Sequence, residues 1–356
     1  MTIERVLSTG NAPAPRVAVR LGLLSFRLAP CTVALATGFT GAVLALYLWS
    51  LNLGEFPVSL DEVIRSALGV GSGEFDFVVR TLRMPRATAA MLVGLAWGCS
   101  GAIFQGLVRN PLVSPDIIGV SNGASLAAVT LIVTGASTRL VPVAALAGAL
   151  ATAFVIYLLT WKGGIHGSRL VLVGIGVNAI LGAGTTFMIV RFPVERVTPA
   201  VLWMTGTLYG RGWEQVAAIA AGGLMLVPAA LALSRRLGLL QLGDHAAAAL
   251  GAPVQVDRSL LLVVGAFLAG LAVAVAGPLG FVALMVPHLG RMLAGPITAG
   301  VLVLSGLLGA TLVLASDIVA QHAFPISLPV GLVTAAVGAP YFLFLLWRTN
   351  RIGGSA

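Results

Sequence analysis

The side chains that could do chemistry are few in this chain, and they form no catalytic constellation. The only lysine, Lys162, is followed by Gly163, so no G-x-x-x-x-G-K-[ST] loop exists to hold a nucleotide phosphate. No H-E-x-x-H pair occurs, and the histidines are scattered at His166, His245, His288 and His322. The chain therefore lacks the residues of an intramembrane protease, a metal enzyme or an ATPase, and any energy for its work comes from a partner.

Two carboxylates, Asp116 and Asp317, lie close to long apolar stretches, and both lie near the predicted ends of those stretches. Ion-coupled transporters usually bury several ionisable groups near the membrane midplane. Asp116 follows Ser114 and Pro115, a typical N-cap residue and a proline at the first helical position. Its expected role is to stabilise the start of a helix through the helix dipole. Secondary transport by the chain alone is therefore kept only as an alternative.

The composition requires a membrane. Of the 356 residues, 58% are hydrophobic and only 9% are charged, whereas soluble domains carry about 25% charged residues. Apolar stretches near ~20 residues match the ~30 Å hydrocarbon core, and backbone groups in lipid must be bonded within the segment. The alternation typical of a membrane barrel is absent. We expect an all-α membrane protein in which the 44 glycines allow close helix packing.

Roughly ten transmembrane helices are predicted. The eighth is too short to cross a bilayer as a straight helix, and the third is interrupted by Gly119 and Gly123. Short surface helices are expected after Ser59, where a capping box with Glu62 begins, and at about 195–206. The predicted spans are 31–51, 87–108, 115–133, 139–161, 169–191, 213–233, 258–277, 283–293, 297–320 and 329–347.

The basic residues predict the orientation. With the N-terminus inside, thirteen of the 21 basic residues lie on the cytoplasmic side and eight lie outside, as the positive-inside rule requires. This pattern explains the net charge of +9 better than nucleic-acid binding does. We expect a retained cytoplasmic tail at 1–30, a single permease domain at 31–348 and a cytoplasmic tail at 349–356. Within the domain, 52–86 is an external loop and 234–257 is a cytoplasmic loop.

An internal repeat is indicated at an offset of 176 residues. The segment 94–96 (Gly-Leu-Ala) recurs at 270–272, Gly101 corresponds to Gly277, and Pro111 corresponds to Pro287. Each half is then an apolar helix, a glycine break and a proline-containing break that opens a short helix. Because five spans separate the matched helices, the halves form two inverted five-helix repeats, a transporter feature. The alternative is an ancestral duplication without present function.

Three segments resemble one family. They are 82–86 with 100–116, which ends in N-P-L-V-S-P-D; 277–291, which holds P-H-L-G-R; and 328–334 with 338–340. In this order and at these distances they are similar to the FecCD family of ABC importer permeases, which move ferric siderophores, haem or cobalamin. The similarity runs from about residue 33 to the end. Further segments at 161–165, 169–170, 174–177 and 317–321 most resemble ferric-enterobactin permeases.

This resemblance implies the partners. Two permease subunits surround a central path, two cytoplasmic ATPase subunits use ATP and Mg²⁺, and an external binding protein delivers the cargo. The two permease subunits are expected to be different chains, with a homodimer as the alternative. The chain itself is expected to bind no cofactor or metal and to be no enzyme. It lies in the lipid bilayer of a bacterial plasma membrane, with both termini in the cytoplasm.

The resemblance also implies a docking site for the binding protein at Arg83 and Arg86. Guanidinium groups suit bidentate recognition of carboxylates, and the alternative is interfacial snorkelling toward lipid headgroups. A third docking arginine of some family members corresponds to Gln321 here. This departure favours a heterodimer whose other subunit supplies the missing charge.

The cytoplasmic loop matches the family's coupling helix, which seats in the ATPase. Asp244 is expected to cap a short alanine helix, which Gly251 closes in the left-handed conformation. The alternative is an ordinary surface turn. The predicted coupling residues are Leu242, Gly243, Asp244, His245, Ala248, Leu250 and Gly251.

The family's inner gate corresponds to Asn110 and Pro111, together with the start of the fifth span at Gly167 and Ser168. A simple helix-terminating turn is the alternative for Asn110 and Pro111. His288 is expected to make a structural hydrogen bond rather than to bind a metal.

The predicted function is ATP-driven import of a ferric siderophore, of catecholate type, from the binding protein to the cytoplasm. The alternatives are import of haem or cobalamin by the same machinery, and a secondary transporter that works alone.

Overall fold

In a computed structural model, the structure describes residues 17–21, 24–28, 30–54, 56, 58–71, 73–161 and 167–353. Lys162, the first 16 residues and the last three lie outside this part. The described part is helical apart from one hairpin in which β1 (Val17–Leu21) pairs antiparallel with β2 (Leu24–Leu28). This hairpin, which joins Val17 to Leu28, was not predicted.

Ten apolar helices account for the ten predicted spans within the described residues. Seven are long enough to cross a membrane, and three are shorter. The long ones are α1 (Pro30–Asn52), η1 with α3 (Phe77–Arg83 and Met84–Val108), η2 with α6 (Thr138–Leu140 and Val141–Thr160), α7 (Gly167–Arg191), α9 (Trp213–Leu240), α11 (Val254–Ala276) and α13 (Ala299–His322). The shorter ones are α5 (Val120–Val133), α12 (Val282–Ala294) and α14 (Val330–Gly353), which is apolar through Leu345. The all-α membrane fold is thus confirmed.

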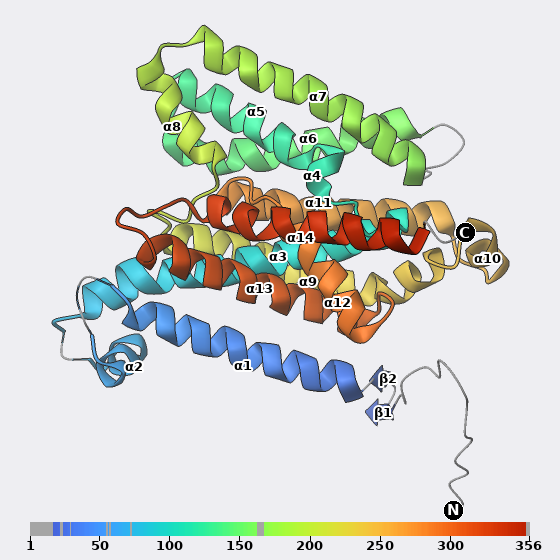
Figure 1. Cartoon of the computed structure of the whole chain (residues 1–356), viewed down its shortest axis with the longest axis horizontal. Coiled ribbons are helices and arrows are strands. Elements are labelled where there is room, and N and C mark those ends of the chain that lie inside the picture. The colour runs from blue at the N-terminus through green and yellow to red at the C-terminus, as the bar shows by residue number, and fades with distance from the viewer. Residues whose placement is uncertain are drawn as a thin grey trace, which may run out of the picture.

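The helices run roughly along one long axis, so the bundle has two ends (Figure 1). One end carries two surface helices, α2 (Leu60–Leu68) and α8 (Val194–Met204), and is called the α2 end here. The other carries α10 (Asp244–Ala249) and is called the α10 end. The first residues of α1 and the last residues of α14 both lie toward the α10 end (Figure 1).

Both predicted surface helices form. The Ser59 hydroxyl accepts a hydrogen bond from the Glu62 N–H at 3.3 Å, which is the cap bond expected at the start of α2. Gly69 ends the helix with φ of 80°, a conformation that glycine adopts at little cost. The predicted break at Gly119 is also present, between α4 (Pro115–Ile118) and α5, whereas Gly123 lies inside α5.

Two loops are shorter than predicted, because charged residues continue the helices there. The π-helix η1 extends α3 back to Phe77, so the loop predicted at 52–86 ends before Phe77. At the other end, α9 continues through Arg235 and Arg236 to Leu240, and α11 begins at Val254. Arginines in the last turns of a membrane helix reach water without ending the helix, which is why their charge was misleading.

The two matched helices of the repeat run in opposite directions. The end of α3 and the start of α11 both lie at Asp244, because Arg109 and Arg258 each contact its carboxylate. The expected breaks are partly wrong, however. Gly101 lies inside α3 and Pro287 lies inside α12, whereas Gly277 does end α11. Glycine in these helices marks close packing as well as breaks.

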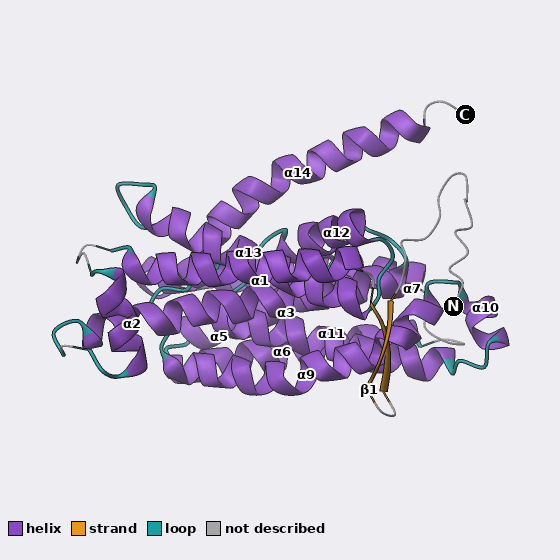
Figure 2. Ribbon diagram, turned by 90° about the horizontal axis from the view of Figure 1, so that it is seen from below, coloured by secondary structure: helices purple, strands orange, loops and turns teal. Residues whose placement is uncertain are grey.

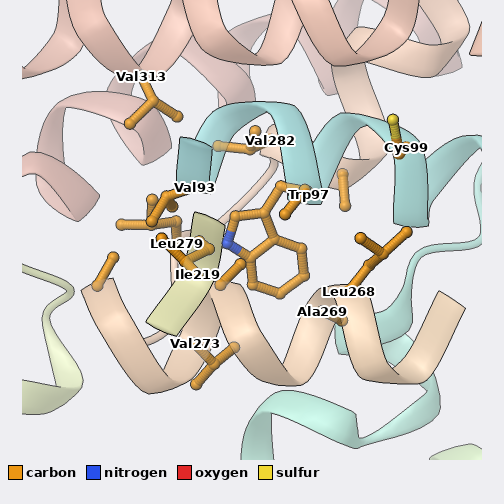
Figure 3. Close-up of a cluster of buried hydrophobic side chains, with 14 of the residues drawn as sticks. Val93, Trp97, Cys99, Ile219, Leu268, Ala269, Val273, Leu279, Val282 and Val313 are labelled. Atoms are coloured by element: carbon orange, nitrogen blue, oxygen red, sulfur yellow. The ribbon is translucent and has the colours of Figure 1, made fainter. Parts of the chain in front are cut away.

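Helix α3 forms the centre of the bundle, and it packs against α9, α11, α12 and α13. Its Trp97 is fully buried between Ile219 of α9 and Leu268 of α11 (Figure 3). On the opposite side, α3 meets α13 without intervening side chains. A Cβ atom at Gly94 would collide with the Gly309 carbonyl, and one at Gly98 would collide with the Ser305 carbonyl.

Helix α14 lies least within the bundle. Its start is held by a hydrogen bond from the Gly331 N–H to the Gly206 carbonyl at 3.1 Å. Farther along, Gly338 packs on Phe281, and Phe342 faces the same ring. Figure 2 shows that the rest of α14 leaves the bundle at an angle. Its exposed apolar side chains include Leu343 and Phe344.

The α3–α13 contact predicts opposite effects of one substitution at two glycines. In a helix, Gly→Ala normally stabilises by about 0.5–1 kcal/mol. At Gly94 the added methyl group overlaps the Gly309 backbone, so Gly94→Ala should destabilise the protein by about 1–3 kcal/mol instead. Gly38 of α1 faces open space, so Gly38→Ala should be neutral or stabilising. Unfolding midpoints in detergent measure both, and a Gly94→Ala protein as stable as Gly38→Ala would contradict this packing.

Candidate coupling and docking sites

The predicted coupling segment forms a short helix, α10, at the tip of the α10 end. Gly243 precedes the helix with φ of 103°, and Gly251 follows it with φ of 80°. The expected left-handed residue at Gly251 is therefore present. The expected cap is wrong, because Gly243 is the N-cap residue and Asp244 is the first helical residue.

Asp244 serves instead as an anchor. Its Oδ1 atom accepts a hydrogen bond from Arg258 of α11 at 2.7 Å and lies 3.7 Å from Nη2 of Arg109, at the end of α3. Arg258 is only 2% exposed. Beside this cluster, Gln241 donates to the Ile297 carbonyl at 3.1 Å. The short helix is thus fixed to three other parts of the bundle.

On the opposite face, the exposed residues of the helix itself are alanines apart from His245. Ala247 is buried against the bundle, whereas His245 and Ala248 are exposed. Leu242 and Leu250, on either side of the helix, are each 62% exposed. The alanine side chains on this outer face keep the helix narrow.

A second ion pair lies close to this site but does not include α10. Nη1 of Arg236 donates to Asp257 at 2.8 Å, which joins the end of α9 to the start of α11. Asp257 is almost fully buried. The loop that holds α10 is therefore rigidly supported, because this ion pair joins the helix before the loop, α9, to the helix after it, α11.

The structure brings the predicted gate segments together. A Cβ atom at Gly167, which begins α7, would lie 3.2 Å from Cα of Val108, which ends α3. Asn110 lies two residues after Val108. Its Oδ1 atom accepts a hydrogen bond from the Leu112 N–H at 2.9 Å. This bond is typical of a turn. Asn110 and Ser168 are exposed, and Pro111 is half-buried.

At the α2 end, two of the three predicted docking residues form a buried cluster around Asp317. Nη2 and Nε of Arg86 donate to the two carboxylate oxygens of Asp317 at 2.9 and 3.1 Å. Nε2 of Gln321 donates to the same carboxylate at 2.7 Å. Arg86 is 16% exposed and Asp317 is 4% exposed. The charge of Arg86 is therefore cancelled within the chain, and the cluster ties α3 to α13.

The third docking residue, Arg83, is bonded differently. Its guanidinium donates to the carbonyl groups of Leu51 at 2.9 Å and Phe56 at 2.7 Å, which hold the segment after α1 against η1. Carbonyl groups are neutral, so they satisfy the N–H donors without cancelling the positive charge. Arg83 is half-buried.

Two residues of this site were missed by sequence reasoning. Asp317 was identified only as a carboxylate near a helix end, although its spacing of four residues from Gln321 indicates a shared helix face. Arg109 was counted only as an inner basic residue. Asp116 lies in the first turn of α4, after the N-cap residue Ser114 and Pro115, as expected, and its carboxylate also accepts a hydrogen bond from Ser121 across the break between α4 and α5. Among the described residues, no three His, Cys, Asp or Glu side chains gather where they could hold a metal ion.

These features define a class of protein: a polytopic all-α membrane protein whose described residues form ion-pair clusters at the two ends of the bundle. The chain belongs to the FecCD transport family, which it matches over residues 42–348. Membrane subunits of this family are permeases of ABC importers, and they are not enzymes because ATP is hydrolysed by separate subunits.

Individual relatives agree with this assignment. The achromobactin transport system permease protein CbrC of Dickeya dadantii is 39% identical over 87% of this chain and 90% of its own length. The ferric enterobactin transport system permease protein FepG of Escherichia coli is 38% identical over 85% of this chain and 92% of its own length. The predicted family is confirmed. The narrower resemblance to ferric-enterobactin permeases is not resolved, because the achromobactin permease is at least as similar to this chain.

A solved structure shares the fold over the whole permease. It is an ABC transporter described as metal-chelate type, in an inward-facing conformation. It aligns with a TM-score of 0.81 and 28% identity, over 89% of this chain and 99% of its own.

The cluster around Asp317 predicts a strongly non-additive effect on stability. Asp317→Asn or Arg86→Met alone leaves a buried charge without its partner, which should cost about 3–5 kcal/mol. The double variant Arg86→Met with Asp317→Leu removes both charges and should recover most of that loss. The exposed pair Asp61–Arg65, at 3.0 Å on α2, is the control, and its loss should cost less than about 1 kcal/mol. Denaturant unfolding of all variants gives the coupling energy; additive effects would show that Arg86 is not held by Asp317.

Proposed function

We propose that this chain is the permease subunit that moves a ferric siderophore from an external binding protein to the cytoplasm, driven by a separate ATPase. The observation that supports this function best is α10: a narrow, alanine-rich, exposed helix whose base is joined by ion pairs to α3 and α11. Such an element suits the transfer of a partner's motion into a membrane bundle. The family assignment supplies the partner, an ATP-hydrolysing subunit.

The cargo class rests on the relatives and on the sequence resemblance. The relatives named above carry achromobactin and ferric enterobactin in their names. The segments at 161–165 and 317–321 further resemble permeases for a catecholate, ferric enterobactin. We therefore propose a ferric siderophore, of catecholate type, as the substrate.

The orientation follows from the coupling site. If α10 meets an ATPase, the α10 end is cytoplasmic and the α2 end faces the binding protein. The hairpin with the start of α1, and the end of α14, then lie on the cytoplasmic side (Figure 1). This orientation agrees with the excess of basic residues that the positive-inside rule assigns to that side.

A second permease subunit is part of the proposal. Two half-open grooves, of about 360 and 320 Å³, lie between helices of this chain and are lined almost only by apolar side chains. The first is lined by Leu150 to Tyr157 of α6 and Ser259 to Phe267 of α11. Eight residues of helix rise about 12 Å, which is well short of the ~30 Å bilayer core. Neither groove is a transmembrane path, which favours a path formed between two subunits.

The gate is proposed at the inner end of that path. Asn110 and Pro111 follow the end of α3, and Gly167 and Ser168 begin α7. Because Gly167 packs closely on Val108, the two segments move as neighbours. The start of α7 is also held at Thr160, because Nη1 of Arg169 donates to its carbonyl at 3.5 Å.

For binding-protein docking, we propose Arg83 as the main cation. Among the described residues, Arg83 donates to carbonyl groups, which leave its positive charge in place, whereas Arg86 is already paired with Asp317. Breaking that buried pair would cost several kcal/mol, so a carboxylate of the partner meets Arg83 more readily. Arg86 and Gln321 then support the docking surface through Asp317.

Reconstituted vesicles test the function directly. Vesicles that hold the complete transporter should accumulate radioactive iron supplied as a ferric tricatecholate on the binding protein, and uptake should stop when ATP, the ATPase or the binding protein is omitted. Uptake that an ion gradient drives in the absence of ATP would refute the proposal. Uptake of haem or cobalamin but not of the iron chelate would refute the proposed cargo and leave ATP-driven import standing.

The coupling helix is tested in the same vesicles. Ala248→Trp adds a large ring to the outer face of α10 and should abolish copurification of the ATPase and ATP-driven uptake, because the helix no longer fits a narrow groove. Ala136→Trp, at an exposed position of the α5–η2 turn at the opposite end, is the matched control and should leave both unchanged. Normal ATPase binding by the Ala248→Trp protein would exclude α10 as the contact.

The docking site predicts a salt-dependent change in affinity. Arg83→Gln should weaken binding of the loaded binding protein to the transporter in nanodiscs by about tenfold at low salt, mostly through slower association. The loss should shrink as salt is raised, because screening weakens the same attraction in the native protein. Arg139→Gln, an exposed arginine on η2, is the control at the same end. Equal affinities of the Arg83→Gln and native proteins at low salt would contradict docking through Arg83.

A further inference from the structure

Arg109 has a backbone conformation that its residue type does not favour. It ends α3 with φ of 59°, and among the described residues only Phe281 is another non-glycine with positive φ. Glycine is the usual residue at such a helix end, because it has no Cβ to crowd the left-handed backbone. Unfavourable backbone conformations persist where the side chain or its position is used. The side chain of Arg109 therefore deserves an explanation beyond ending the helix.

That side chain reaches the coupling helix. Nη2 of Arg109 lies 3.7 Å from Oδ1 of Asp244, and its Nη1 lies close to Gly243, the residue before the helix. The same Oδ1 atom accepts the 2.7 Å bond from Arg258. One carboxylate oxygen is thus shared by the end of α3, the first residue of α10 and the start of α11.

The two contacts to Asp244 differ in strength. Arg258 is 2% exposed and only 2.7 Å from Asp244, so leaving its buried guanidinium without this partner would be costly. Arg109 is 44% exposed and more distant, and exposed pairs contribute little to stability. Asp244 therefore stays with α11, while its contact with Arg109 can be made and released without unfolding the loop.

The position of Arg109 in the chain connects this contact to the gate. Arg109 directly precedes Asn110 and Pro111, and Val108 before it packs on Gly167 at the start of α7. A displacement of α10 that closes or opens the Arg109–Asp244 contact therefore moves the residue that joins α3 to the gate segment.

We propose that Arg109 and Asp244 are positioning residues for transport: their contact passes the movement of α10 to the gate residues 110–111. This inference rests on the proposed function, and it adds which residues couple ATP hydrolysis to gate movement. The coupling is an ion pair that is made in one state of the transporter and released in another. Loss of the contact then separates ATP hydrolysis from import, while the ATPase still binds.

The substitution Arg109→Gly separates this role from a purely structural one. If Arg109 only ends α3, glycine is the better residue there, and stability and transport should be equal or higher. If Arg109 positions the gate, the Arg109→Gly protein should be as stable as the native one and should bind the ATPase. Its iron import per ATP hydrolysed should fall at least about fivefold, a typical size for the loss of coupling between two sites.

Two further variants make the test specific. Arg109→Lys keeps the charge and should retain more than about half of the native import per ATP, since lysine makes a point-charge contact with a carboxylate. Asp244→Asn keeps an oxygen acceptor for Arg258 but removes the charge that attracts Arg109. It should therefore show the same fall in iron import per ATP as Arg109→Gly, and it tests the contact independently if the Arg109→Gly protein does not fold. Arg65→Gln, an exposed arginine on α2, controls for reconstitution and should import normally.

The outcomes distinguish this inference from the proposed function. Native vesicles must import the ferric tricatecholate with ATP, or the proposed function itself fails. Given native import, an Arg109→Gly protein with the native ratio of iron to ATP would overturn the positioning role. Loss of ATPase binding by Arg109→Gly would overturn it as well, because Arg109 would then support docking rather than coupling.

Discussion

The structure depends on how closely α3 and α13 approach each other. In hydrocarbon, apolar side chains gain nothing by leaving lipid for another helix, so association relies on packing of small residues and on polar bonds. At Gly94, Gly98 and Gly309 the two backbones touch without side chains between them. Because α3 also packs on α9, α11 and α12, this contact fixes the axis around which the other helices are arranged.

Polar groups within the bundle strengthen the same axis. Ser100 of α3 donates to the Gly265 carbonyl of α11 at 2.7 Å, and Gln105 donates to the Leu284 carbonyl of α12 at 2.9 Å. Both side chains are buried. In the absence of water, such groups are expensive unless bonded, so each one specifies which helices lie next to α3. With Arg86 and Asp317 at the α2 end, α3 is tied to its neighbours along its whole length.

Much of this fold could be predicted, because membrane spans are recognised by the length of their apolar segments. All ten spans, the two surface helices and the short helix at 244–249 were expected from composition, capping residues and glycines. The errors occurred where charged residues continue a helix, as Arg80 and Arg83 do in η1 and Arg235 and Arg236 do in α9. Helix ends near the membrane surface are decided by packing against neighbours, which a local pattern does not contain.

The site was predicted less completely, for a physical reason. The residues proposed for coupling and docking were selected by resemblance, and resemblance did not predict the bonds that they make. Arg86 and Asp317 are separated by 231 positions in the chain, and a single sequence does not show which distant charges meet. Asp244 illustrates the same limit at short range: as an acidic residue beside glycine and alanine it indicated a helix cap, whereas its carboxylate in fact joins Arg258 and Arg109.

The ion pairs at the two ends of the permease differ in geometry and in exposure. At the α2 end the ion pair is bidentate, buried and completed by Gln321, so it keeps α3 and α13 in a fixed relation. At the α10 end the contact between Arg109 and Asp244 is longer and half-exposed, so it resists displacement weakly. If a rigid bundle is driven from its α10 end, it will yield first at that contact. In the proposed mechanism, movement of α10 therefore reaches the end of α3, and the proposed gate beside it, before it disturbs the packed core around Trp97.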